Sequence, residues 1–229
     1  LSQANLSGVI LCEAGLSVSN LSGADLSRTD LREANLCWAN LTGINLSGAD
    51  LRDADLNEAN LREANLRGAD LWFTSLSGAN LSGANLMGAD LRLAHLDGAR
   101  LSEACLSRAN LWLADLSEAN LENADLNRVS SWLADFSGAS LSGANLSGAY
   151  FRGANMHQAN LSRADLSEVN LRGANLYGAD LSQTNMSNAD LSGADLSQAN
   201  LSGSTVLPTQ LRTVNSFTGA ILPDGARFK

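Results

Sequence analysis

The chain contains few of the residues that build a compact globular core. Of its 229 residues only 5% are aromatic, two are proline and three are cysteine. A compact globule with so few bulky side chains would pack poorly, which favours a repeat architecture. The cysteines, Cys12, Cys37 and Cys105, are odd in number and include no Cys-x-x-Cys pair. We therefore expect free thiols in a reducing compartment, and neither a disulfide framework nor a zinc site.

Positive charge and long apolar runs are also scarce. Lys and Arg number 15 against 24 Asp and Glu, which gives a formal net charge of −9. Because nucleic-acid binding depends on neutralising phosphates, we expect no direct binding of DNA or RNA. No run of about 20 apolar residues occurs, so we expect no membrane insertion by this segment. A cytoplasmic location is expected, with a lumenal or periplasmic one as the alternative.

What the chain does contain is leucine at every fifth residue. The register holds from Leu1 to Leu201, with only a few replacements, such as Phe136 and Met186. A small residue, usually Ala, stands two places before each central residue, and Asn or Asp stands between them. A period of five suits neither a helix nor a flat strand. It predicts a chain that turns a corner every five residues, with the leucine and the small residue pointing inward.

Repeats such as Ala-Asn-Leu-Ser-Gly recur almost verbatim over residues 1 to about 205. In this the sequence resembles the pentapeptide-repeat family, and Phe217–Gly225 resembles the C-termini of its cyanobacterial members. The resemblance implies an all-β fold, a right-handed quadrilateral β-helix with a Leu-filled interior, in which four repeats form one coil. About ten coils would give a rod about 50 Å long. We expect residues 1–205 to form this solenoid and residues 206–229 to form a C-terminal capping tail.

Several positions depart from the repeat. Ser131 occupies a central position, and we expect the rings of Phe136 and Phe151 to fill the volume it leaves. Gly is common two places after the centre, where corners need a positive φ. Corners without Gly, such as Glu33 or Arg108, are expected to use a different turn type.

The two chain ends depart from it as well. After Pro208 the pattern places Leu211 and Val214 inward. It places Ser216 in a central position and leaves Phe217 out of phase with the repeat. We expect this tail to cover the last coil. The chain starts within a repeat and without Met, so we expect it to be a piece of something longer. The first coil, which has no comparable cap, is then a candidate for dimerisation or for contact with a preceding segment.

Sorting the outward positions by side predicts one unusual surface. On the side centred on Leu31, Leu51 and Leu71, three of the four tryptophans share one column, and four large apolar residues run beside them. We call this set the Trp/Leu stripe; its members are Trp72, Phe73, Leu93, Trp112, Leu113, Trp132 and Leu133. Arginines flank it in the same column as the tryptophans: Arg32, Arg52, Arg92, Arg152 and Arg172. The stripe is interpreted either as an interface or as self-stacking that stiffens one side.

No constellation typical of an enzyme accompanies the repeat. His95 and His157 fall at different surface positions several coils apart, and no phosphate loop or nucleophile motif occurs. Asp alternates freely with Asn, which indicates a hydrogen-bonding role at the corners and not acid–base chemistry. We therefore expect no catalytic residues, no cofactor and no metal.

The leading hypothesis is a non-catalytic scaffold that binds an unidentified protein partner, or itself, through the Trp/Leu stripe. The first alternative, suggested by the family resemblance, is a DNA mimic that modulates a type II topoisomerase. The acidic charge and the rod shape permit it, but the Leu centres differ from the Phe-rich centres of gyrase-binding relatives. The second alternative is a soluble repeat module of a larger protein, including a membrane-attached one.

Overall fold

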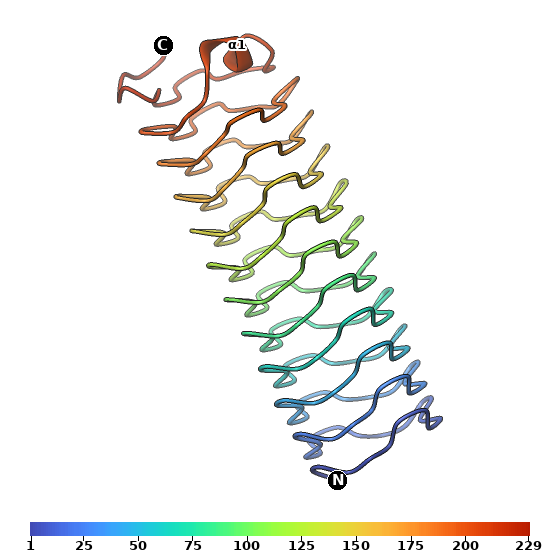
Figure 1. Ribbon diagram of the computed structural model, residues 1–229. Helices are drawn as coiled ribbons and strands as arrows, with labels where there is room; N and C mark the ends of the chain where they lie inside the picture. The colour runs from blue at the N-terminus through green and yellow to red at the C-terminus, as the bar shows by residue number, and fades with distance from the viewer.

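A computed structural model describes residues 1–229 as a straight rod of stacked square coils (Figure 1). Successive coils pair in parallel between residues 20 apart, from Asn5 with Asp25 to Asp180 with Asn200. The only helix, α1, spans Pro208–Leu211 at the C-terminal end (Figure 1). There are no extended strands, because each side of a coil contributes a single bridged residue before the chain turns.

Each side pairs with its neighbours through three backbone hydrogen bonds. On the side centred on Leu26, the Leu26 N–H donates to the Asn45 carbonyl at 2.7 Å and the Arg28 N–H to the Ser47 carbonyl at 3.0 Å. The Asp25 N–H donates in the opposite direction, to the Ala4 carbonyl at 2.9 Å. Because these bonds involve only the backbone, the outward side chains are free to vary from coil to coil.

The leucines and small residues fill the interior. From Leu21 to Leu201 every central leucine is at most 1% exposed, and the buried residues form one continuous core of 70 members. Leu6, Leu11 and Leu16 in the first coil are only partly buried. The interior of the rod is therefore packed with side chains.

The corner turns are uniform although their residues differ. The second residue after each centre has a positive φ whether it is glycine, as at Gly23 (65°), or not, as at Glu33 (58°) and Arg108 (60°). The expectation of a different turn type at corners without glycine is therefore wrong. The Glu33 N–H donates to the Arg52 carbonyl in the next coil at 3.0 Å. Such bonds hold a left-handed conformation that costs a non-glycine residue about 1–2 kcal/mol.

The Asn and Asp residues before the centres stabilise the same corners. Asp25 Oδ1 accepts a hydrogen bond from the Ser27 N–H at 3.0 Å, a group that the backbone pairing leaves free. The same oxygen accepts from Asn45 Nδ2 at 2.9 Å, which links neighbouring coils. Both residue types offer the acceptor, so they interchange, and the structural role inferred for them is confirmed.

Ser131 is fully buried in its central position, and its Oγ has no hydrogen-bond partner. The rings of Phe136 and Phe151 meet edge to face beside it, with their centroids 5.3 Å apart. A buried hydroxyl without a partner is unfavourable. That these rings fill the volume left by the short side chain stays a prediction.

The tail departs from the predicted register. Asp195 bridges to Ser216, which lies 21 residues further on, while the Asn215 N–H still donates to the Ala194 carbonyl at 2.8 Å. This extra residue is a β-bulge. It moves Ser216 to the bridge position and Phe217 to the centre, so the prediction of a central Ser216 and an out-of-phase Phe217 is wrong.

Helix α1 replaces one side of the last coil, and the Gln210 side chain takes over its pairing. Gln210 Nε2 donates to the carbonyls of Met186 and Ala189, both at 2.9 Å, and Gln210 Oε1 accepts from the Leu207 N–H at 2.7 Å. Further on, Ile221 pairs with Arg227 in an antiparallel bridge. The tail thus occupies backbone groups that another coil would otherwise pair with.

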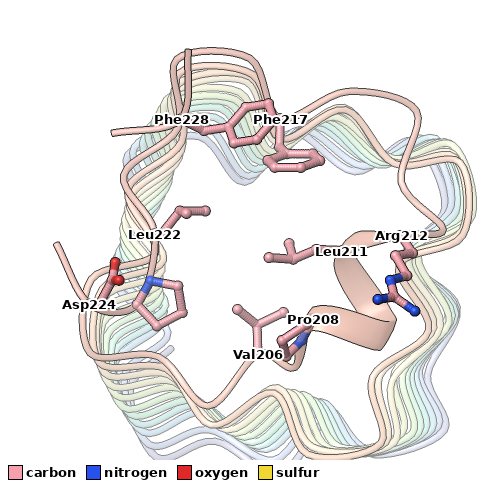
Figure 2. A pocket seen from close by; sticks show the side chains of 9 residues that line it. Val206, Pro208, Leu211, Arg212, Phe217, Leu222, Asp224 and Phe228 are labelled. Atoms are coloured by element: carbon pink, nitrogen blue, oxygen red, sulfur yellow. The ribbon is translucent and has the colours of Figure 1, made fainter. Parts of the chain in front are cut away.

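The centre of the last coil remains open. Figure 2 shows Val206, Leu211 and Leu222 pointing into a hollow at the end of the rod, with a volume of about 490 Å³. Phe217 and Phe228 pack against each other on one wall of it, with ring centroids 4.1 Å apart. Leu211 and Val214 pack against the core, as the repeat pattern predicts.

Replacing Ser131 by Ala should stabilise the rod by about 1 kcal/mol, because it removes a buried hydroxyl without a partner and leaves almost no cavity. The urea midpoint of unfolding, followed by circular dichroism, measures the change. Thr74→Ala is the control: the buried Thr74 Oγ1 donates to the Leu51 carbonyl at 2.7 Å, so its loss should lower the midpoint. A lower midpoint for Ser131→Ala would show that its hydroxyl is satisfied.

Replacing Gln210 by Ala should loosen the tail, because the Ala189 carbonyl and the Leu207 N–H lose their partner and the Met186 carbonyl keeps only the Ala189 N–H. Hydrogen exchange at the amides of Leu211 and Arg212 should accelerate by about tenfold or more, the equivalent of about 1.4 kcal/mol of local stability. Gln158→Ala, at an exposed corner remote from the tail, serves as the control. Unchanged exchange in the Gln210 variant would contradict the pairing role of its side chain.

Candidate interaction surface on one side of the solenoid

The backbone pairing brings the predicted stripe together on one side of the rod. Bridges connect Asp70, Asp90, Asn110, Ser130 and Tyr150 in sequence, so the residues that follow these positions form columns. Four consecutive coils thereby place all seven stripe residues on the same side. Tyr150, half exposed, continues the bridged column beside the stripe.

Most of the stripe is exposed to solvent. Leu133 is 58% exposed, Trp132 46% and Trp112 41%, with Phe73 and Leu113 in the same range. Trp72 and Leu93 are half buried. Other exposed large apolar residues of the regular coils, such as Trp38 and Tyr177, stand on a different side.

The two halves of the stripe differ in their internal contacts. In the first half, the rings of Trp72 and Phe73 lie 5.7 Å apart, and Phe73 meets His95 edge to face at 5.6 Å. In the second half no ring contacts another ring of the stripe. Trp112 and Trp132 instead line a shallow groove of about 390 Å³, together with Arg92, Asn110 and Ser130.

The apolar column occupies strained turn positions. Phe73, Leu93, Leu113 and Leu133 all have φ between 54° and 59°, the left-handed region that favours glycine. Leu133 leans over the next coil, where its Cδ2 is 2.8 Å from the place that a Cβ at Gly153 would take. Because Gly153 has no Cβ, it leaves space for the Leu133 side chain.

The flanking arginines fall into two groups. Arg32, Arg52 and Arg92 each form a close ion pair with the Asp two residues earlier, at N–O distances of 2.5–2.7 Å. Arg172 is only 3.8 Å from Asp190. Arg152 forms no ion pair and lies over the ring of Trp132, with its Cζ 5.7 Å from the ring centroid.

These ion pairs shift the titration of their members. The hydrogen bonds from the Arg32 side chain and backbone lower the pKa of Asp30 to about 2, and the Arg52 side chain lowers the pKa of Asp50. Away from the stripe, burial and the nearby Asp55 raise the pKa of the Cys37 thiol to about 11. At neutral pH the Cys37 thiol therefore stays protonated, as expected for a thiol without a nucleophilic role.

The structure adds two features that the sequence did not single out. The ring of His95, a residue interpreted only as a surface histidine, packs against Phe73. The amide N–H groups of Trp132 and Arg152 have no acceptor within the chain, because Ser130 and Tyr150 stand where most repeats have Asn or Asp. The replacement of Asn or Asp in the bridged column was the signal that could have revealed the second feature.

No group of three or more His, Cys, Asp or Glu side chains is arranged to hold a metal ion. The four-residue α1 is the only helix, and no helix is long and apolar enough to cross a membrane.

Comparison with known proteins places this geometry in a family. The family model for pentapeptide repeats matches eight copies, over segments that together span residues 1–130 and 133–203. The cyanobacterial protein HetL of Nostoc sp. strain PCC 7120, a pentapeptide-repeat protein involved in heterocyst differentiation regulation, is 36% identical; the match covers 99% of this chain and 94% of HetL, with a TM-score of 0.32. No curated protein sequence matches the chain.

Two further solved structures are similar. Rfr23, a pentapeptide-repeat protein of the cyanobacterium Cyanothece 51142, is 38% identical over 44% of this chain and 62% of its own, with a TM-score of 0.28. QnrB1, a plasmid-mediated fluoroquinolone resistance protein, is 21% identical over 78% of this chain and 86% of its own, with a TM-score of 0.39.

The repeats and the stacked coils define the protein as a β-solenoid scaffold. The chain belongs to the pentapeptide-repeat family, whose fold is a right-handed quadrilateral β-helix. Proteins of this family are generally non-enzymatic structural and interaction modules.

The pairing of Asp30 with Arg32 predicts a measurable pH dependence. Because folding lowers the Asp30 pKa from 3.8 to about 2, the pair stabilises the folded state above about pH 4, and this contribution is lost as the pH falls towards 2. NMR titration of the Asp30 carboxyl carbon should give the low value, and Arg32→Gln should return it towards 3.8.

Asp190 provides the matched control for this titration. Its pKa is lowered chiefly by the Ser192 hydroxyl and least by Arg172, so Arg172→Gln should change it little. An Asp30 pKa that stays low in Arg32→Gln would assign the shift to the backbone instead of the guanidinium.

Proposed function

We propose that this protein is a non-catalytic scaffold that binds another protein, or a second copy of itself, through the Trp/Leu stripe. The observation that carries the proposal is the exposed run of Trp112, Leu113, Trp132 and Leu133 on two consecutive coils. Contiguous exposed apolar surface mediates interaction in most soluble proteins that carry it, and Trp is enriched at the centres of interfaces.

The small contribution of the leucines to folding also supports the proposal. The column that holds Leu113 and Leu133 reads Gly at positions 153, 173 and 193, so the same turn forms with the residue that suits it best. Leucine there adopts a left-handed backbone that favours glycine, and its exposed side chain gains little from burial. A residue that contributes so little to folding is typical of a binding surface.

Self-stacking explains the first half of the stripe better than the second. Trp72, Phe73 and His95 contact one another. Neither Trp112 nor Trp132 contacts another aromatic ring, and Trp132 has a cation–π contact with Arg152. The interaction surface is therefore proposed to centre on the groove between Trp112 and Trp132.

We also propose that residues 206–229 act as an end cap for the repeats of residues 1–205. The Gln210 side chain and the antiparallel Ile221–Arg227 bridge support this, because both occupy groups to which a further coil would bind.

Replacing Trp112 and Trp132 together by Ser should abolish partner binding and leave the fold unchanged. Ser is the commonest residue at this position of the repeat, so backbone pairing tolerates it. Loss of two central aromatic contacts should weaken binding by at least about tenfold. Affinity capture from an extract of the native source, compared between the two chains by mass spectrometry, measures the effect.

Trp38→Gly is the control, because Trp38 is an even more exposed tryptophan on another side, at a turn position where Gly is common. It should capture the same partner as the unaltered chain. Sedimentation velocity distinguishes self-association from binding of another protein. If the stripe binds a second copy, the unaltered chain should sediment as a dimer and the double variant as a monomer. A partner that binds the double variant and the unaltered chain equally, with no difference in sedimentation, would refute the proposal.

A further inference from the structure

The second half of the stripe, Trp112 to Leu133, lies in a part of this side that lacks carboxylates over several coils, whereas Trp72, Phe73 and Leu93 stand in the coils of Asp70 and Asp90. Elsewhere the bridged column of this side carries aspartate, at Asp30, Asp50, Asp70, Asp90 and Asp190. Across the intervening coils its outward positions are Asn110, Trp112, Leu113, Ser130, Trp132, Leu133, Tyr150, Arg152, Gly153, Asn170, Arg172 and Gly173. In a chain with a net charge of −9, this region carries positive charge.

Several arginines of this region form no ion pair. Arg32, Arg52 and Arg92 are each neutralised by an aspartate of their own side, whereas Arg152 forms no ion pair. Arg108 and Arg128, exposed at the corner that leads into this side, form none either. Asp115 and Asp135 are bridged residues of the next side, two places after Leu113 and Leu133, and Glu168 stands two coils beyond Arg128 in its column, so positive charge borders one edge of the stripe only.

Unpaired backbone donors lie in the same place. The N–H groups of Trp132 and Arg152 have no acceptor in the chain, and both residues are exposed. N–H groups and guanidinium groups are both donors to carboxylates, while the groove between Trp112 and Trp132 offers apolar and aromatic contact.

From this combination we infer that the stripe binds an acidic segment of a partner protein that carries aromatic or large aliphatic side chains. The inference rests on the proposed function and specifies the partner's chemistry. The apolar side chains occupy the groove between the two tryptophans, and carboxylates of the segment bind Arg152 and the edge formed by Arg108 and Arg128. Arg92, held by Asp90, closes the groove at its other end.

A random dodecapeptide library displayed on phage tests the inference. Binders are selected on the full chain and sorted by whether Trp112→Ser/Trp132→Ser abolishes their binding. The stripe-dependent binders should be net negative and should contain aromatic or large aliphatic residues. Stripe-dependent binders that are basic or uncharged would overturn the inference and leave the proposed function standing, whereas a complete lack of stripe-dependent binders would contradict both.

One selected peptide, synthesised and labelled, then measures the contribution of charge. Arg152→Gln should weaken its binding about tenfold, the effect of losing one charge-assisted hydrogen bond, and should reduce the dependence on salt. Arg62→Gln, which removes an exposed arginine from another side, should change the affinity by less than about twofold. Equal effects of the two variants on the affinity would overturn the inference. A single-stranded oligothymidylate serves as a nucleic-acid probe, and tighter binding of this probe than of the peptide would overturn the inference as well.

Discussion

Parallel backbone pairing between residues 20 apart is the constraint from which the other features follow. It requires a corner after every centre, and so imposes a left-handed residue in each repeat, whether that residue is Gly23 or Glu33. It stacks the leucines into one core and leaves one N–H per corner for Asn or Asp to satisfy. Where the pairing stops, at α1, the Gln210 side chain substitutes for it.

The same constraint separates the fold from the outer surface. Because only backbone groups, the centre and the small position determine the coil, a side can change its character without a change of shape. On the side that carries the stripe, the bridged position and the position after the centre hold Asp50 and Arg52 in one coil. Four coils later the same two positions hold Ser130 and Trp132. This freedom explains how a repetitive rod can hold one local surface with its own charge and apolar groups.

The five-residue spacing of leucine predicted which residues point inward, and the resemblance to the pentapeptide-repeat family, which implies four repeats per coil, was needed to sort the outward residues into columns. It could not predict the left-handed conformation of Glu33 or Arg108, since residue propensity opposes it and only the bond to the next coil maintains it. The bulge at Asn215 and Ser216 shifts Phe217 inward by one residue, which a fixed period cannot anticipate. Likewise, the contact of His95 with Phe73 and the unpaired N–H of Trp132 depend on side-chain placement.

The central claim is that one side of the rod is an interaction surface while the rest is scaffold. Hydroxyl-radical footprinting of the full chain, alone and in an extract of its native source, tests this with tryptophans as internal probes. Trp112 and Trp132 should be protected several-fold in the extract, while Trp38, which is 63% exposed on another side, should oxidise at the same rate in both. Equal oxidation of all three tryptophans in the two conditions would contradict the claim.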